Sequence, residues 1–524
     1  MAGKRGCCGT EEDKEEQYCA VHGKHQRWKE ICSPKIRNSG TGRHTKNRKT
    51  SLDDRPHFTY ILPPASSMFP DNISTTMKRR HMILHASSVL LLLAAPARPQ
   101  AITADSVRNE FLHAWNGYVR YAWGSDALRS VSQTPRNWYR VSLCMTPVEA
   151  FDGLLLMGLH SEARQAKALI MDSLSFDQDI EVQSFEITIR LLGGLLSAYQ
   201  MDGDSRFLSL AHDLGTRLLP VFGSRTGMPY RFVNLRTGQV RDSLNNPAEI
   251  GTALLEFGAL SRLTGQPAFY TAARKALDTL YSRRSRIGLV GTTINVETGE
   301  WVDRTSHIGG MIDSYYEYLV KAWLLFRDEE CRTMALSALD AVSQYVADTR
   351  DGHLWYGQVD MDTGERIGTS FGALEAFFPA VLCLMGDTTN ARALQESCYR
   401  MWTLHGIEPE TIDYATMTIT RPQYYLRPEI IESAYYLYRV TRDPRYRSMG
   451  ETFYRSLVRY CRTESGYAAL QSVVTGEKRD EMESFFLAET LKYLYLLFAP
   501  DSTLPFGSVV FTTEAHPLIN TWNR

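Results

Sequence analysis

Acidic residues interrupt four of the most apolar segments of this chain of 524 residues. The four are Glu186 in 184–199, Asp313 in 309–318, Glu429 in 426–433 and Glu489 in 483–490. Acidic side chains are rarely buried unless they are paired or functional. For each one alone, a helix-start carboxylate or a buried ion pair is the commoner explanation. Four such helices facing one cavity would instead supply the paired carboxylates that general acid and base catalysis needs.

Two of these acids have a neighbour at helical spacing. Arg190 lies four residues after Glu186, so both side chains share a helix face and can pair. Phe485 shares a face with Glu489 in the same way. Carboxylates beside an aromatic wall are typical of glycoside hydrolysis, in which one acid protonates the leaving oxygen, another activates water and a ring stacks on the sugar.

The other two acids lie at predicted helix starts. Asp313 follows a flexible turn at Gly309-Gly310 and opens an aromatic helix. Pro428 fixes a helix start, which puts Glu429 in the first turn and Glu432 below it.

The stretch 509–517 is out of character in a chain that otherwise predicts helices. Val509 to Phe511 favours a strand, and a strand so near a terminus must be held by something because terminal residues usually fray. We expect it to insert into a cavity made by the helices. The hydroxyl and carbonyl of Thr513, beside the Glu514 carboxylate, are hard oxygen ligands of the kind that Ca²⁺ takes. An edge strand capped by a polar turn is the alternative.

A repeat of about 60 residues runs through the rest of the chain. Polar turns that start helices recur at 204, 266, 328, 387 and 443, which are separated by 62, 62, 59 and 56 residues. Each repeat is one helical hairpin, and roughly seven fit the length. A closed ring buries both of its ends and accommodates the terminal strand. We therefore predict an all-α fold, an (α/α)7 barrel plugged by the C-terminal β-hairpin, with small β-hairpins near 228–234, 292–299 and 355–360 building the site on one face.

Composition separates the N-terminal region from the rest. Overall, 44% of residues are hydrophobic and the net charge is −1, which argues against binding to nucleic acid or membrane surfaces by bulk electrostatics. Residues 1–56 are highly charged and predict disorder. Their cysteines and histidines match no zinc spacing that we would accept. We expect residues 1–76 to be a disordered or misassigned extension.

Residues 77–97 have the layout of a secretory signal peptide, with a basic start, an apolar run and a small-residue site. We expect Met77 to be the true start, and a short signal anchor is the alternative. The mature domain is predicted at 106–520. Its five scattered cysteines are not a disulfide framework, although one bridge is possible. The Asn-x-Ser/Thr site at Asn72 precedes the signal, which favours bacterial export slightly over passage through an endoplasmic reticulum.

Five motifs in order resemble glycoside hydrolase family 47, the class I α-1,2-mannosidases, over about 115–517. They are FEITIRLLGGLLSAY at 185–199, DSYYEYL at 313–319, LRPE at 426–429, SFFLAETLKY at 484–493 and TEAHP at 513–517. The resemblance implies a calcium-dependent, inverting exo-mannosidase on an (α/α)7 barrel. It makes Glu186 the general acid, acting through a water, Glu429 the general base, Asp313 a third carboxylate and Thr513 the Ca²⁺ ligand.

The resemblance also implies positions that bind sugar or the waters of the calcium ion. These are Arg190, Glu249, Arg427, Glu432, Phe485, Glu489 and Glu514. In inverting enzymes the two carboxyl groups stand about 6.5 to 9.5 Å apart to admit a water. The metal would bind sugar hydroxyls and orient the nucleophile.

The chain departs from the family pattern at two places. Met311 stands where endoplasmic-reticulum members have arginine, so restriction to one mannose branch is not expected. Ala373-Leu374-Glu375-Ala376-Phe377 replaces His-Leu-x-Cys-Phe, so the family disulfide should be missing and Cys398 unpaired. These features, with Gly227 to Tyr230 and Trp355-Tyr356, look like the degradation-enhancing mannosidase-like branch.

The leading hypothesis is therefore a monomeric, exported enzyme that removes terminal α-1,2-mannose from oligomannose N-glycans or α-1,2-mannosides. It would be periplasmic or secreted in a bacterium and in the endoplasmic reticulum lumen of a eukaryote, with no membrane span left after signal cleavage. A mannose-binding quality-control factor with weak catalysis is the second hypothesis. An unrelated (α/α)-barrel lyase or epimerase is the third, and it leaves the calcium motif unexplained.

Overall fold

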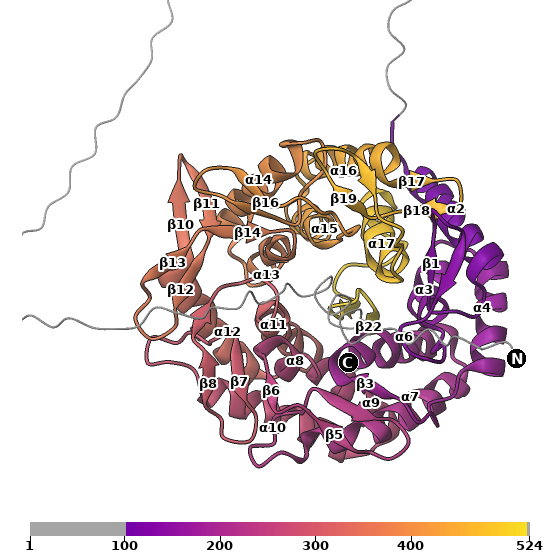
Figure 1. Ribbon diagram of the computed structural model, residues 1–524, viewed down its shortest axis with the longest axis horizontal. Helices are drawn as coiled ribbons and strands as arrows, with labels where there is room; N and C mark the ends of the chain where they lie inside the picture. The colour runs from indigo at the N-terminus through magenta and orange to yellow at the C-terminus, as the bar shows by residue number, and fades with distance from the viewer. Residues whose placement is uncertain (1–100, 521–524) are drawn as a thin grey trace, which may run out of the picture. The chain divides into compact units, whose positions relative to one another are not determined.

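The computed structural model describes residues 101–520, so the predictions for residues 1–76 and 77–97 lie outside the described residues. Helices alternate along the chain between an inner and an outer ring (Figure 1). The last inner helix packs against the first outer helix, which closes the ring. The predicted (α/α)7 barrel is confirmed.

Seven segments of the described chain form the inner ring and seven form the outer ring. The inner segments are α3 (Met145–Leu156), α5 (Ser184–Ile187) with η1 (Thr188–Leu192) and α6 (Gly193–Asp202), α8 (Pro247–Gly251) with α9 (Leu254–Thr264), α11 (Asp313–Phe326), η4 (Leu374–Phe377) with α13 (Phe378–Leu384), α15 (Glu429–Thr441), and η6 (Phe486–Thr490) with α17 (Leu491–Phe498). The outer segments are α2 (Ala104–Ala122), α4 (His160–Ser173), α7 (Ser205–Leu218) with η2 (Leu219–Gly223), α10 (Pro267–Ser282), α12 (Glu329–Ala341) with η3 (Val342–Val346), α14 (Thr388–Thr403), and α16 (Arg445–Ser456) with η5 (Leu457–Cys461).

The sequences of the two rings differ as their burial requires. On α7 the buried residues follow one stripe, running from Phe207 through Ala211 and Leu214 to Leu218, which is the pattern of a helix with one face in solvent. On α11 eleven residues are buried, among them Glu317 and Lys321. A helix apolar nearly all round belongs inside a fold, so the inner ring can carry acids into the barrel interior.

The repeated polar turns join each inner helix to the next outer helix. The side chains of Asp204, Asp328 and Asp387 each accept a backbone hydrogen bond and cap α7, α12 and α14, because an Asp oxygen can satisfy a free amide of the first turn. Gly203 and Gly265 end α6 and α9 with a left-handed backbone, which glycine adopts at little cost. The period found in the sequence is thus one inner and one outer helix.

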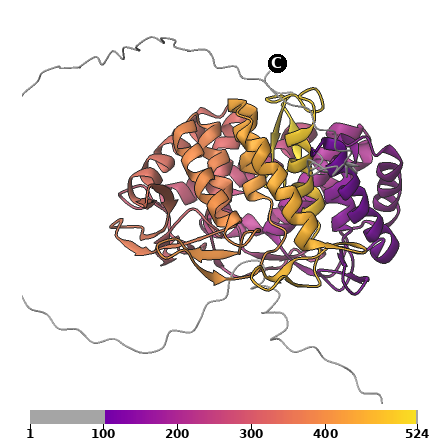
Figure 2. The same cartoon turned by 90° about the horizontal axis from the view of Figure 1, so that it is seen from above.

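Short antiparallel strands gather at one end of the barrel (Figure 2). They are β1 (Ala127–Arg129), β2 (Thr134–Arg136), β3 (Glu181–Gln183), β4 (Phe232–Asn234), β5 (Val240–Arg241), β6 (Leu244–Asn245), β7 (Thr293–Asn295), β8 (Trp301–Asp303), β9 (Thr305–Ser306), β10 (Ala347–Arg350), β11 (His353–Tyr356), β12 (Gln358–Asp360), β13 (Arg366–Gly368), β14 (Ser370–Gly372), β15 (Thr411–Asp413), β16 (Thr418–Arg421), β17 (Arg462–Thr463), β18 (Gly466–Tyr467), β19 (Leu470–Ser472) and β20 (Glu477–Lys478). They lie in the loops that lead from an outer helix to the next inner one, so they set where each inner helix begins.

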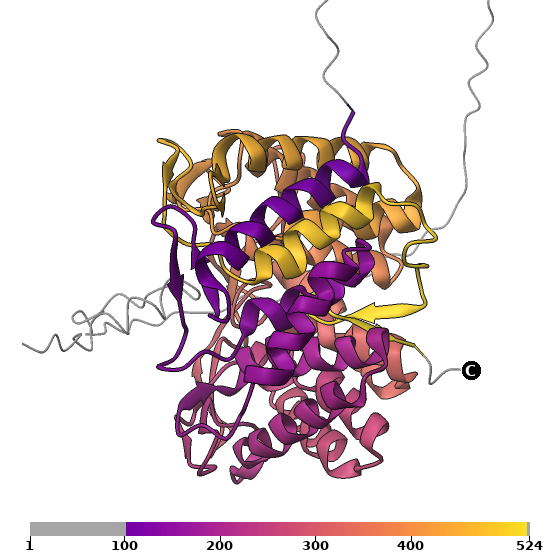
Figure 3. The same cartoon turned by 90° about the vertical axis from the view of Figure 1, so that its right-hand side faces the viewer.

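The C-terminal hairpin pairs β21 (Val509–Phe511) with β22 (Pro517–Ile519). It contacts α11 through β21 and α6 through β22. Figure 1 shows it inside the ring, and Figure 3 shows it at one end of the barrel. Its turn is buried, because Ala515 and His516 are fully inaccessible. The predicted plug is present, and it brings residues 512–516 into the barrel interior.

Buried charges hold this plug in place. Asp152 on α3 forms a 2.5 Å ion pair with Lys492 of α17, and its other oxygen lies 2.7 Å from Nδ1 of His516. Lys492 also donates to the Ala515 carbonyl at 2.7 Å. Burial alone would raise the pKa of Asp152, but Lys492 and His516 outweigh burial and hold the pKa below its ordinary value. Removing one partner would leave a buried charge uncompensated, which is strongly destabilising.

Two further sequence expectations meet the structure here. The five cysteines of the described chain, Cys144, Cys331, Cys383, Cys398 and Cys461, are free and buried. The single helix expected over 184–199 is wrong in detail, since residues 188–192 form a π-helical turn between α5 and α6. None of the described helices is long and apolar enough to cross a membrane.

Candidate active site

Arg190 gathers carboxylates from three parts of the chain. Its Nε donates to Glu186 at 2.8 Å, which confirms the predicted pair, and its Nη1 donates to Glu514 of the hairpin at 2.9 Å and to Glu149 of α3 at 3.3 Å. All four side chains are buried. Three carboxylates around one guanidinium cannot all be neutralised by it, so burial raises the pKa of Glu149 and of Glu514 although Arg190 opposes the rise.

Aromatic rings cover this arginine. Its guanidinium lies 5.1 Å from the centre of the Trp138 ring and 5.7 Å from that of Phe485, within the range of a cation–π contact. Sequence analysis predicted Phe485 but missed Trp138 and Glu149. Glu149 lies on an apolar helix like the four acids that were found, and Ser484 donates to it at 2.7 Å.

Two predicted residues lie in π-helical turns of the inner ring. Arg190 lies in η1 and Glu489 lies in η6. A π-helical turn inserts an extra residue and changes the direction of the side chains around it, and such turns are frequent at functional sites. Helical spacing in the sequence cannot reveal them, because the surrounding residues still follow the ordinary period.

A second arginine organises the opposite group of acids. Arg427 binds Glu410 through two hydrogen bonds of 2.8 and 3.3 Å. Glu429, the first residue of α15, is partly exposed, but its Oε2 atom is buried without a hydrogen-bond partner in the described chain. Burial raises the pKa of Glu429 to about 8 although Arg427 opposes the rise. Sequence analysis missed Glu410, which lies in a loop and not on an apolar helix.

Asp313 is the first residue of α11 and is partly exposed. Its amide donates to the Gly309 carbonyl at 3.0 Å, and its Oδ1 accepts from the Ser314 amide at 2.8 Å. The charge of Asp313 also acts on Glu375. Burial raises the pKa of Glu375 to about 7, and the charges of Asp313 and Glu410 raise it further. The Glu375 carboxyl also lies close to the backbone before Asp313, because a Cβ at Gly309 would come within 2.4 Å of it. Glu375 thus connects Asp313 to the Arg427 group.

Glu432 lies one turn below Glu429, as predicted. It accepts from Tyr493 at 3.1 Å and from Lys321 at 3.5 Å. Lys321 also pairs with Glu317 and donates to the Thr512 carbonyl at 3.4 Å. Glu432 is therefore linked through Lys321 to the turn of the C-terminal hairpin.

Glu489 lies among the other acids. Burial raises its pKa well above the ordinary value, and the charges of Glu514, Glu429 and Glu432 raise it further. Glu489 therefore feels the charges of Glu514 in the Arg190 group, of Glu429 and of Glu432. This region contains more carboxyl groups than cations, so it would attract a positive ion.

Thr513 supplies oxygens for such an ion. Its amide donates to the Tyr318 hydroxyl at 3.2 Å, while its carbonyl and hydroxyl accept or donate no hydrogen bond within the described chain. No three His, Cys, Asp or Glu side chains of residues 101–520 are placed to hold a metal. Two free hard oxygens beside an excess of carboxyl groups fit a calcium ion whose remaining ligands are water.

Glu249 has partners of its own at the start of α8. Its Oε1 accepts from Gln183 at 3.0 Å, from Asn246 at 3.0 Å and from Arg231 at 3.0 Å. Because Gln183 ends β3 and Ser184 begins α5, Glu249 holds the segment that leads directly to Glu186.

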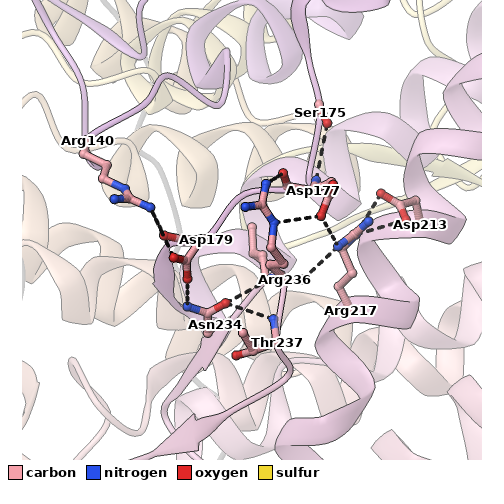
Figure 4. Close-up of polar contacts among 10 residues, drawn as sticks. Arg140, Ser175, Asp177, Asp179, Asp213, Arg217, Asn234, Arg236 and Thr237 are labelled. Atoms are coloured by element: carbon pink, nitrogen blue, oxygen red, sulfur yellow. Dashed lines mark hydrogen bonds and ion pairs between the residues drawn. The ribbon is translucent and has the colours of Figure 1, made fainter.

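A surface network fixes the same segment from outside (Figure 4). Asn234 donates to Asp179 at 2.9 Å, and Arg236 donates to Asp177 at 3.1 Å. Arg140 also contacts Asp179, so the loop that carries Trp138 is tied to the strand before Glu186. Exposed pairs of this kind contribute about 0 to 1 kcal/mol each, so the network orients the segment more than it stabilises the fold.

Four non-glycine residues beside the site have a left-handed backbone. Cys144 precedes α3, Met311 precedes Asp313, Leu426 precedes Arg427 and Ala515 follows Glu514, with φ of 53°, 77°, 63° and 55°. Such residues cost about 1 to 3 kcal/mol each and collect where function requires a particular chain direction.

A sequence model of "Glycosyl hydrolase family 47" matches residues 110–520. The mouse "Endoplasmic reticulum mannosyl-oligosaccharide 1,2-alpha-mannosidase" is 37% identical over 462 residues, which cover 81% of this chain and 68% of the relative. The human "ER degradation-enhancing alpha-mannosidase-like protein 2" is 37% identical over 455 residues, which cover 79% of this chain and 77% of the relative. The solved "alpha-1,2-mannosidase from Trichoderma reesei" superimposes with a TM-score of 0.73 at 27% identity, covering 80% of this chain and all of that one.

Proposed function

This chain belongs to glycosyl hydrolase family 47 and is a glycoside hydrolase, and from that membership we propose that it is a calcium-dependent, inverting exo-α-1,2-mannosidase that trims terminal mannose from oligomannose glycans. The observation that carries the proposal is the convergence of Glu186, Glu429, Glu489 and Glu514 from separate inner helices and the C-terminal hairpin. These groups, with rings at Phe485 and Trp138, suit a site that cleaves a glycosidic bond.

In this proposal the side chains of the site divide the steps of the reaction among them. Glu186, oriented by Arg190 at 2.8 Å, delivers a proton through a water to the leaving oxygen. Glu429 takes a proton from the attacking water on the other face of the sugar, and the anomeric configuration inverts. Asp313 is the third carboxylate and stabilises the positive charge that develops on the ring. Arg427, Glu249, Glu432 and Glu489 bind sugar hydroxyls or ordered water.

Thr513 would hold the calcium ion through its hydroxyl and carbonyl. When bound, calcium supplies charge that polarises sugar hydroxyls and lowers the pKa of water. Glu432, Glu489 and Glu514 orient the surrounding water molecules. We further propose that residues 77–97 direct the domain to a compartment that contains glycoproteins, the endoplasmic reticulum lumen in a eukaryote, as the names of its relatives suggest.

The test is hydrolysis of an α-1,2-linked mannobiose by the purified chain, with and without a chelator and with calcium added back. We expect activity that chelation abolishes and calcium restores. Calcium should also raise the unfolding temperature of the wild-type chain and not that of Thr513→Ala, a readout independent of catalysis. Full activity in excess chelator, with no metal found by elemental analysis, would overturn the calcium assignment.

A mannose-binding quality-control factor with weak catalysis is the second candidate. The similarity to the human degradation-enhancing relative and the residues Met311 and Ala376 favour it. Retention of Glu186, Asp313 and Glu429 favours the enzyme, because a binding protein could lose one of them without penalty. Glycan binding without turnover at any calcium concentration would select the second candidate.

A further inference from the structure

Glu408 is a carboxyl group that the proposed mechanism does not use. It is fully buried, and neither of its side-chain oxygens has a hydrogen-bond partner within residues 101–520. Native proteins almost always satisfy buried polar atoms, so such a group needs an explanation. The Oε2 atom of Glu429, the predicted base, is also buried and without a partner there.

The two acids belong to one tightly held cluster. The Glu410 amide donates to the Gln423 carbonyl at 2.6 Å, and the Tyr424 hydroxyl donates to the Arg427 carbonyl at 3.1 Å. The first bond joins the segment that carries Glu408 to the loop that enters α15 at Glu429, and the second holds that loop in shape just before Glu429.

The nearby cation is already occupied. Arg427 places two of its nitrogens on the Glu410 carboxylate, so Glu410 receives most of its charge. Glu408 therefore has no cation of its own in the described chain, and a second carboxylate beside Glu429 and Glu410 would be strongly repelled.

Glu408 is expected to keep its proton. Burial raises its pKa well above the ordinary value, and the charges of Glu429 and Glu410 raise it further while Arg427 opposes them. The titratable or charged groups around the pair are Glu410, Cys398, Tyr424, Arg427, Glu432 and Glu489. Arg427 is the one cation among them, so a proton on Glu408 also relieves the repulsion between the carboxyl groups.

We propose that Glu408 is a protonated positioning residue that donates its carboxyl hydrogen to Oε2 of Glu429, directly or through one water. This inference rests on the proposed role of Glu429 as the base. The hydrogen bond satisfies both buried groups and holds the Glu429 carboxylate in one orientation, with its other oxygen left for the attacking water.

The same hydrogen bond explains how Glu429 can be ionised at neutral pH, as a general base must be. A carboxyl group with a pKa of about 8, which burial gives Glu429, is mostly protonated at neutral pH and cannot accept a proton. A donor bonded to the ionised form favours that form and lowers the pKa of the acceptor. Glu408 therefore extends the activity of the enzyme towards lower pH.

Two substitutions separate this role from simple packing. Glu408→Gln stays neutral and keeps a donor, so its profile of kcat against pH should overlay that of the wild type. Glu408→Leu fills the buried space but donates nothing. In this variant we expect the acidic limb of the profile of kcat against pH to move up by about one pH unit. At pH values below that limb kcat should be roughly tenfold lower than in the wild type, and KM should be unchanged. Equal profiles for the Leu variant and the wild type would overturn the proposal, as would equal losses in both variants.

Infrared difference spectroscopy gives a second readout that needs no substrate. The wild type at neutral pH should show the carbonyl stretch of a protonated carboxylic acid that Glu408→Gln lacks, and this band should shift in Glu429→Gln. An absent or unmoved band would refute the proposed proton and its bond. If the wild type hydrolyses no mannoside, the proposed function fails while the spectra still decide the state of Glu408.

Discussion

Of the two acids in the first turn of α15, Glu429 is better placed than Glu432 to act as the base. Glu429 differs from its neighbour Glu432 in being partly exposed, whereas Glu432 is bonded to Tyr493 and Lys321. A base must reach the water that it activates, so Glu429 suits the role better. Position and partners distinguish two acids of the same helix turn.

Glu429→Gln keeps the shape of the side chain and removes its basicity. We expect kcat to fall by about 10²-fold or more while the sugar still binds. Steady-state kinetics and calorimetric binding of a mannobiose measure the two quantities. Near-normal turnover would assign the base to another carboxylate, most directly Asp313.

Met311 is the residue at which specificity is expected to differ from the restrictive relatives. Its backbone is left-handed and its carbonyl accepts from the Ala248 amide at 2.9 Å, so the chain direction there is fixed. Arg327 and Arg442 adopt the same backbone region, which indicates that arginine can be accommodated at 311.

We expect the wild type to trim an oligomannose glycan past the first mannose, with several isomers appearing together. Met311 is apolar and flexible, whereas Met311→Arg adds directional donors that can bind one branch, so the variant should narrow the products. Chromatography of a timed digest measures this. A single isomer accumulating from the unmutated enzyme would show that loops elsewhere decide the branch.

At the scale of elements, the turn that ends each inner helix has a common backbone. Gly203 and Gly265 occupy the left-handed position after α6 and α9, whereas Arg327 and Arg442 occupy it after α11 and α15. A side chain in that region costs about 1 to 2 kcal/mol. The backbone is therefore locally strained at these two arginines, which lie outside the site.

Arg327→Gly should raise the free energy of unfolding by roughly 1 kcal/mol, because Arg327 is exposed and makes no ion pair in the described chain. Arg442→Gly should gain less, since Arg442 pairs with Asp501 at 2.7 Å. Differential scanning calorimetry would measure both. Arg327→Ala is the control and should gain nothing; an equal gain for Ala would attribute the effect to loss of the arginine side chain.

At the scale of the whole molecule, the barrel buries several acids that keep their protons. Burial raises the pKa of Glu256 to about 8, and Tyr318 donates to it at 2.7 Å. The unfolded chain would release this proton near pH 4.5, the ordinary value. Between these values the folded state binds one more proton, so stability is greatest below pH 4.5 and is lost as pH rises towards 8.

Without metal, the free energy of unfolding should therefore fall by about 1.4 kcal/mol per pH unit for each such group as pH rises from about 5 to 8. The unfolding temperature should fall with it. Glu256→Gln should reduce the slope of the free energy of unfolding against pH by the contribution of one titrating group. Asp152 acts in the opposite direction but only below its ordinary value of 3.8, outside this range. His307 and His516, whose pKa values burial lowers, also act in the opposite direction up to their ordinary value of 6.5, so the fall should be steepest above pH 6.5. Thermal melts in excess chelator measure the slope. Identical slopes for variant and wild type would mean that Glu256 is ionised in the folded protein.

Local patterns in the sequence were sufficient to predict the barrel. Apolar periodicity, Asp caps and a repeat of about 60 residues depend on neighbours in the chain, and they predicted the hairpins, the closed ring and the terminal plug. The same patterns found Glu186, Arg190, Glu432 and Glu489, because an acid on an apolar helix conflicts with its surroundings wherever the helix lies.

Only the tertiary structure revealed which of these groups meet. Glu149, Glu408 and Glu410 enter the site from a helix interior and a loop, and Glu514 joins Arg190 across 324 residues of sequence. The π-helical turns at Arg190 and Glu489 are invisible to periodicity. Fold class follows from short-range patterns that every helix repeats. The balance of charge and hydrogen bonds in the site depends on distances between remote segments, which are fixed only when the ring closes and the hairpin enters it.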